Sequence, residues 1–82
     1  MTVWVDNAAV LFRGKPRFHL AASSLPELQA FAERAGVRRC WFHPGQRPHY
    51  DITEEQRARA LDLGAVPVSP RTLVRLLQKT LH

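Results

Sequence analysis

The stretch SLPELQAFAERAGVRRCWF, residues 24–42, decides the fold class because it joins an amphipathic helix to an apolar strand. It begins with the S-x-x-E pattern of a capping box, and its proline is tolerated in the first helical turn. Apolar residues then recur at helical spacing until Gly36, a residue that often ends helices in the left-handed conformation. VRRCWF carries apolar residues on both faces, which predicts a buried strand at residues 37–42.

The segments before this helix are shorter and more mixed. TVWVD, residues 2–6, is β-branched and apolar on both faces, which predicts an interior strand. FHLAA, residues 18–22, predicts a second short strand. The intervening NAAVLFRGKPR, residues 7–17, contains a glycine and a proline, and we expect a loop there.

The segments after residue 42 complete the pattern. We expect a loop at residues 43–52, after which Thr53 and Gln56 form a T-x-x-Q capping box for a second helix that runs to Leu63. Asp51-x-x-Glu54 is an alternative capping box, so the sequence allows either Asp51 or Thr53 as the N-cap of this helix. AVPV predicts a fourth strand at an edge of the sheet, because its proline cannot donate a hydrogen bond. A last helix is expected at residues 70–81.

Strands that alternate with helices through short connections are typical of βα units. We therefore expect a single small α/β domain over residues 1–82, with a three- or four-stranded, mostly parallel sheet and three helices. The leucines of the last helix form an apolar stripe, which also permits a homodimer. Three of them define this alternative interface: Leu73, Leu77 and Leu81.

Composition limits the classes of function. The chain has 82 residues, 45% hydrophobic and 23% charged, within the range of globular domains. Its net charge of +5 is compatible with a nucleotide, a nucleic acid or an acidic partner protein. Its single cysteine, Cys40, cannot form an internal disulfide and fits a reducing cytoplasm. We expect a cytoplasmic protein without a membrane partner, because the sequence has neither a secretory signal at its start nor a run of about 18 apolar residues.

Several segments in order carry a resemblance to a known family: VWVD, FHLAASSLPELQAFAERAGVRRCWF, HYDIT and RARALDLGAVPV. Together they resemble the bacterial and phage proteins of the domain of unknown function 4031 (DUF4031) family, over residues 1–68. The final helix, residues 70–81, lies outside this resemblance. The resemblance implies no activity, but it implies a set of shared polar residues: Asp6, His19, His49, Tyr50, Asp51 and Arg57.

RPHYDITEEQ, residues 47–56, is the densest polar stretch of the chain. A helix that begins here would offer free N–H groups and a positive dipole end, which favour an anion. Arg47, His49 and Arg57 supply donors that suit a phosphate, and the ring of Tyr50 suits stacking on a base. These residues are also explained by a capped helix with a solvated loop.

Asp6 follows the first strand, where α/β sheets commonly place ligand contacts. If Asp6 lies near Asp51, the two carboxylates and the imidazole of His49 suit Mg²⁺ or Mn²⁺ for phosphoester hydrolysis. A zinc site made of Asp6, His19, His49 and Asp51 is a second alternative. It requires the strand of His19 to run antiparallel to the first strand, because parallel strands would separate His19 from Asp6 by roughly 15 Å.

The leading hypothesis is a protein that recognises a phosphate-containing ligand, a nucleotide or a nucleic acid. It is either a metal-dependent phosphoester hydrolase or a binding module without turnover. The catalytic candidates are Asp6, His49 and Asp51, the ligand-binding candidates are His19, Arg47, Tyr50 and Arg57, and the metal candidates are Asp6 and Asp51. The alternative is a protein-interaction or oligomerisation module.

Overall fold

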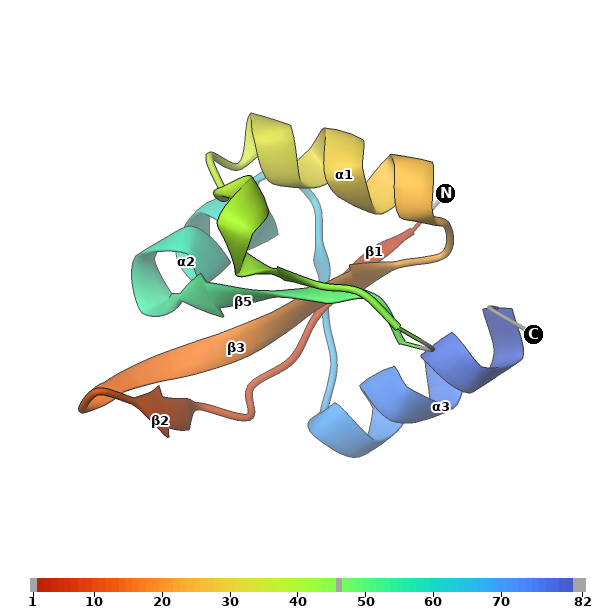
Figure 1. The fold of residues 1–82 in the computed structure, drawn as a ribbon. Helices are drawn as coiled ribbons and strands as arrows, with labels where there is room; N and C mark the ends of the chain where they lie inside the picture. Colours follow the sequence, from red (N-terminus) through yellow and green to blue (C-terminus); the bar gives the residue numbers. More distant parts are fainter. Residues whose placement is uncertain (1, 46, 81–82) are drawn as a thin grey trace.

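A computed structural model describes residues 2–45 and 47–80 of the chain, the side chains of Cys40 and Thr80 excepted. Helices α1 and α2 cover one face of a mixed β-sheet, and α3 lies on the other face (Figure 1). The elements in chain order are β1 (Val3–Val5), β2 (Val10–Phe12), β3 (Lys15–Ala22), α1 (Leu25–Arg34), the 3₁₀ helix η1 (Arg39–Trp41), β4 (Phe42–His43), β5 (His49–Thr53), α2 (Glu54–Asp62), β6 (Val66–Pro67) and α3 (Pro70–Thr80).

The sheet is mostly antiparallel, so the expectation of a three- or four-stranded, mostly parallel sheet is wrong. Its described strands follow the order β4-β5-β3-β1-β6, and β2 also pairs with β3. Among the strand pairs of residues 2–45 and 47–80, only β1 and β6 are parallel. Short connections join β2 to β3 and β4 to β5, which makes these neighbours antiparallel. Strands β3 and β5 are antiparallel as well, although α1 lies between them in the sequence. The three predicted helices are confirmed.

Strands β2 and β3 form a hairpin in the segment where we expected a loop. The two residues between them, Arg13 and Gly14, have φ values of +53° and +79°. Positive φ at both central residues is typical of the two-residue turns that match the twist of a hairpin. An arginine rarely occupies such a position, which is why the sequence did not indicate this turn.

The segment between α1 and α2 is also different from the expectation. The predicted strand at residues 37–42 is wrong, because η1 occupies residues 39–41 and strand pairing begins only at Phe42, in the two-residue β4. The predicted loop at residues 43–52 contains β5, which pairs with β3 from Arg17↔Thr53 to Leu20↔Tyr50. The long β3 thus offers both of its edges to partners, and this pairing across the chain is not visible in a local pattern.

The predictions that rest on local chemistry are confirmed. The side chain of Ser24 accepts a hydrogen bond from the backbone of Glu27, and Gly36 is left-handed with φ of +75°. Thr53 and Gln56 form the reciprocal capping box of α2, so the alternative box at Asp51 is wrong. Strand β6 lies at an edge of the sheet as expected.

The core has two parts, one on each face of the sheet. The larger part joins α1 and α2 to the side chains of one face, among them Val5, Leu20 and Ile52, all fully buried. The smaller part packs Leu73 and Leu77 of α3 against Trp4 and Ala21. Two leucines of the proposed dimer stripe are therefore buried within the chain, and Leu81 lies outside the described residues.

Replacement of Leu73 by alanine is expected to lower the free energy of unfolding by about 2–5 kcal/mol, because it leaves a cavity between α3 and the sheet. Leu73 is only 4% exposed, whereas its neighbour Val74 is 38% exposed on the same helix. The control Val74→Ala is expected to cost less than about 1 kcal/mol. Urea unfolding of the two variants measures both values, and equal losses would show that α3 does not pack as described.

Candidate metal centre on the open face of the sheet

Strand β5 divides the polar triplet His49–Asp51 between the two faces of the sheet. Successive side chains of a strand point to opposite faces. Tyr50 and Ile52 accordingly enter the core under α1 and α2, with exposures of 3% and 0%. His49 and Asp51 point to the opposite face, and His19 on the neighbouring β3 stands directly across from Asp51 in the strand register.

Asp6 is buried at the point where the chain leaves β1, and it holds His19 in place. The backbone N–H of Asp6 donates to the carbonyl of His19 at 3.0 Å, and the Oδ1 of Asp6 accepts from the backbone N–H of His19 at 2.8 Å. Its Oδ2 lies 2.6 Å from His19 Nδ1. The antiparallel alternative for these strands is thus confirmed, and Asp6 and His19 are in contact.

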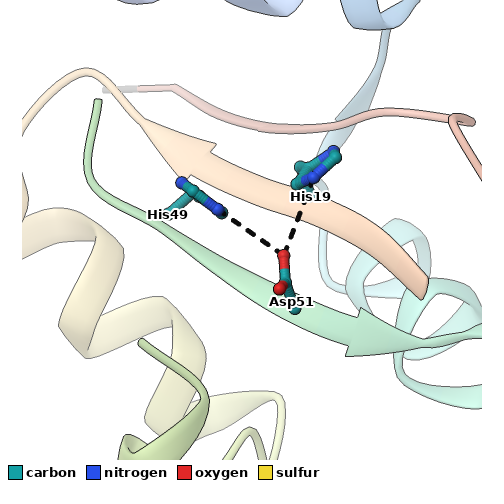
Figure 2. Close-up of side chains that lie close together, drawn as sticks. All are labelled: His19, His49 and Asp51. Carbon is teal, nitrogen blue, oxygen red and sulfur yellow. Dashed lines mark ion pairs between the residues drawn. The ribbon is translucent and has the colours of Figure 1, made fainter. Parts of the chain in front are cut away.

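The tautomers of two histidines follow from their acceptors. The carbonyl oxygen of Arg47 can only accept, so His49 Nδ1 donates to it at 2.8 Å. The ionised carboxylate of Asp6 likewise accepts from His19 Nδ1. In their neutral forms both imidazoles therefore carry a lone pair on Nε2, the nitrogen that lies on the side of Asp51 in each case (Figure 2).

The carboxylate of Asp51 lies between three imidazoles. Its Oδ2 is 2.9 Å from Nε2 of His43, a contact that fixes the rotamer of Asp51. Its Oδ1 lies 3.7 Å from Nε2 of His19 and 3.5 Å from Nε2 of His49. This oxygen is buried and accepts no hydrogen bond from the described residues. Buried polar oxygens nearly always have a partner, so this is the oxygen of Asp51 that can accept from a further group such as a water or a metal ion.

The geometry around Asp51 Oδ1 suits a metal ion. One ligand atom each from His19, His49 and Asp51 lies within 4.8 Å of the other two. Two ligands about 2.0–2.1 Å from a tetrahedral zinc ion stand about 3.3–3.4 Å apart, close to the two distances from Asp51 Oδ1. Asp6 would support this set from outside, because a carboxylate that accepts from the far nitrogen of a histidine orients the ring toward a metal.

The electrostatics of Asp6 and His19 agree with this arrangement. Burial raises the pKa of Asp6, but the hydrogen bonds from the side chain and backbone of His19 outweigh it and hold the pKa below its ordinary value. The hydrogen bond to Asp6 raises the pKa of His19, against the opposing effect of burial. A more basic imidazole is also a stronger donor to a metal ion, with which protons then compete.

The other predicted ligand-binding residues lie elsewhere. Tyr50 is 3% exposed, packs its ring 5.1 Å from that of Phe42, and has its pKa raised by burial, so it lies away from the cluster on the other face of the sheet. Arg57 on α2 donates from Nε to the carbonyl oxygen of Asp6 at 2.9 Å, which gives it a structural contact. Arg47 is exposed and contributes its carbonyl oxygen to His49. Helix α2 begins only after its N-cap Thr53 and packs on the face of the sheet opposite to Asp51.

His43 and Trp41 lie near the site and were not singled out from the sequence. His43 pairs with His49 across β4 and β5, and their rings stack with centroids 5.1 Å apart. The signal for this pair was the HPGQRPH segment, in which two histidines flank a turn rich in proline and glycine. Arg17 and Trp41 join His43 in the wall of an adjacent pocket, and no local pattern of the sequence pairs them.

Fold and site together define a small mixed α/β protein with a cluster of histidines and a carboxylate on the sheet face that α3 leaves open. The chain belongs to the DUF4031 family, described as proteins of unknown function, whose model matches residues 3–80. The resemblance inferred from residues 1–68 is thereby confirmed, and the match extends through α3. No curated protein and no solved structure is similar enough to the chain to count as a match.

Among residues 2–45 and 47–80, no helix is both long enough and apolar enough to span a membrane.

Proposed function

We propose that the protein is a metal-dependent hydrolase of phosphoesters that holds one divalent transition-metal ion at His19, His49 and Asp51. The observation that carries the proposal is the buried Oδ1 of Asp51, which accepts no hydrogen bond from the described residues and lies 3.5 Å and 3.7 Å from two imidazole nitrogens. Two imidazoles and one carboxylate are typical of zinc and non-haem iron sites. The ligand set therefore favours Zn²⁺ over the Mg²⁺ expected from two carboxylates.

The roles of the side chains follow from their contacts. Asp6 fixes the tautomer and the orientation of His19, and the carbonyl of Arg47 does the same for His49. His43 holds the rotamer of Asp51 through Oδ2, which leaves Oδ1 toward the two imidazoles. A bound divalent ion would polarise a phosphoryl oxygen and lower the pKa of a coordinated water to about 7.

Cationic side chains beside the cluster support an anionic substrate. Arg17 lines the same pocket as His19 and Asp51, and Arg13 and Lys15 lie at the turn of the same β2–β3 hairpin. The chain as a whole carries a net charge of +5, which favours the approach of a phosphate ester. The side chains of the cluster are about one-third exposed or more, apart from His49 at 28%, so a substrate can reach them.

The first test is binding of the metal alone. Zn²⁺ at 100 times its dissociation constant is expected to stabilise the folded protein by about 2.7 kcal/mol, a shift that differential scanning fluorimetry detects. Mn²⁺ is expected to give a smaller shift, and Mg²⁺ the smallest, because Mg²⁺ prefers oxygen ligands. Equal shifts for Zn²⁺ and Mg²⁺, or none for any ion, would contradict the proposed centre.

The second test is turnover. The zinc-loaded protein is expected to release p-nitrophenol from p-nitrophenyl phosphate, and treatment with a chelator is expected to remove the activity. Asp51→Asn is expected to lose this turnover, and Asp62→Asn, which makes the same chemical change at an exposed position of α2, serves as the control. Metal and phosphate binding without turnover by any variant would favour the binding module over the hydrolase.

Self-association is the second candidate function, and one observation favours it. Strand β2 exposes three apolar side chains, Val10, Leu11 and Phe12, of which Leu11 is 72% exposed. Exposed apolar edge strands are prone to pair with another chain. In this case Leu11→Lys would convert a dimer to a monomer in light scattering, whereas a wild-type monomer would argue against the function.

A further inference from the structure

A pocket of about 340 Å³ lies directly beside the candidate metal centre. One part of its wall is apolar and comes from β2 and from Trp41 of η1. The remaining part contains Arg17 and three members of the cluster, His19, His43 and Asp51. A ligand that fills this pocket therefore meets an apolar surface at one end and the proposed metal site at the other. The volume is that of a small-molecule site.

The apolar end offers flat surfaces of the kind that hold a planar ring. The guanidinium carbon of Arg17 lies 4.7 Å from the centroid of the Trp41 ring and 5.6 Å from that of Phe12. Nucleobases stack on aromatic side chains and on the plane of an arginine, and they do so with little regard to sequence. The guanidinium group and the two rings near it provide both kinds of surface in one place.

The exposure of this wall also indicates an occupant. Phe12 is 54% exposed and Val10 is 53% exposed, although both lie beside a hollow that would remove them from water if it were filled. The charge of the neighbouring residues indicates which kind of ligand with an apolar part fits the pocket. Arg17 inside the pocket and the cations of the β2–β3 turn favour a ligand that joins its ring to an anionic group.

We infer that this pocket binds the base of a nucleotide, stacked on Trp41, Phe12 and Arg17, while its phosphate reaches the metal centre at His19, His49 and Asp51. The inference rests on the proposed function and names its substrate class. Residues of β2 and η1 would then stack on the base, in place of Tyr50, which is buried on the other face of the sheet.

Trp41 provides a reporter for this binding. The four common ribonucleosides, which lack phosphate, are titrated into metal-free protein and followed by tryptophan fluorescence. At least one is expected to quench the emission in a saturable way, and Trp41→Leu is expected to remove the response while the buried Trp4 still emits. In parallel, ribose 5-phosphate, which lacks a base, is titrated into zinc-loaded protein by calorimetry. It is expected to bind without quenching.

Phe12→Ala tests the stacking wall, and the variant is expected to stay folded because Phe12 is 54% exposed. It is expected to weaken the binding of the quenching nucleoside roughly 5- to 150-fold, the range of a lost base–aromatic stack. Val74→Ala, an exposed apolar residue on α3, serves as the matched control and is expected to leave the affinity unchanged.

The two arms separate this inference from the proposed function. Binding of ribose 5-phosphate without a response to any nucleoside would overturn the base pocket and leave the phosphoester site standing. Nucleoside binding without any binding of ribose 5-phosphate to the zinc-loaded protein would instead overturn the link between pocket and metal centre. Loss of a dimer in Phe12→Ala, with no nucleoside response in the wild type, would assign the apolar wall to self-association and overturn the inference.

Discussion

Replacement of Asp51 by asparagine is expected to weaken Zn²⁺ binding by more than about 100-fold, beyond the loss typical of residues that only support a ligand. The substitution removes the negative charge of the one carboxylate within the cluster of His19, His49 and Asp51. An asparagine amide is a poor zinc ligand. If its NH₂ group took the place of Oδ1, a hydrogen-bond donor without a lone pair would point at the metal position between the imidazoles. Calorimetric titration with Zn²⁺ measures the change, and turnover is expected to fall with it.

The fold of this variant is expected to persist. Asp51 is about one-third exposed, and the oxygen of an asparagine can still accept a hydrogen bond from His43. The metal-free melting temperature should therefore stay within a few degrees of the wild type, and Asp62→Asn should bind Zn²⁺ as the wild type does. Wild-type Zn²⁺ affinity in Asp51→Asn would remove this carboxylate from the site.

Replacement of Asp6 by asparagine is expected to lower Zn²⁺ affinity about 10- to 100-fold without contact between this residue and the metal. The carboxylate now accepts from Nδ1 of His19 at 2.6 Å. An asparagine that keeps its oxygen on the two backbone N–H groups would turn its NH₂ group toward Nδ1. His19 would then move its proton to Nε2, and the nitrogen that faces Asp51 would lose its lone pair.

A structural effect of Asp6→Asn must be separated from this positioning effect. The loss of a hydrogen bond to a charged group is expected to lower the free energy of unfolding by about 1.5–3 kcal/mol, measured in urea. Two-dimensional NMR of the histidine ring nitrogens then reads the tautomer directly. The account predicts protonation of His19 at Nδ1 in the wild type and at Nε2 in the variant, whereas the same tautomer in both would exclude the positioning role.

The sequence predicted those parts of the fold that depend on local chemistry. Ser24, Gly36 and the pair Thr53–Gln56 act within one turn of helix, and their hydrogen bonds and backbone angles were therefore foreseeable. Strands β2 and β5 depend instead on pairing with β3, which lies distant from β5 in the sequence. The short, mixed segments that form them carry little strand signal of their own, and a loop was the natural interpretation.

The error in β5 changed the interpretation of the site. As a loop, HYD offers all three side chains to a ligand, whereas as a strand it buries Tyr50 and exposes His49 and Asp51 together. The contact between Asp6 and His19 was foreseen as the outcome of an antiparallel arrangement, and the register of β1 and β3 decides in its favour. His43 could be added only once β4 was known to pair with β5.

The central claim is that one metal ion is held by three side chains of neighbouring strands. A crystal of the zinc-loaded protein, with anomalous diffraction recorded at the zinc edge, tests it most directly. The account predicts one peak about 2.0–2.2 Å from Nε2 of His19, Nε2 of His49 and Oδ1 of Asp51. Zinc bound only at other residues, with Asp51 Oδ1 still without a ligand, would contradict it.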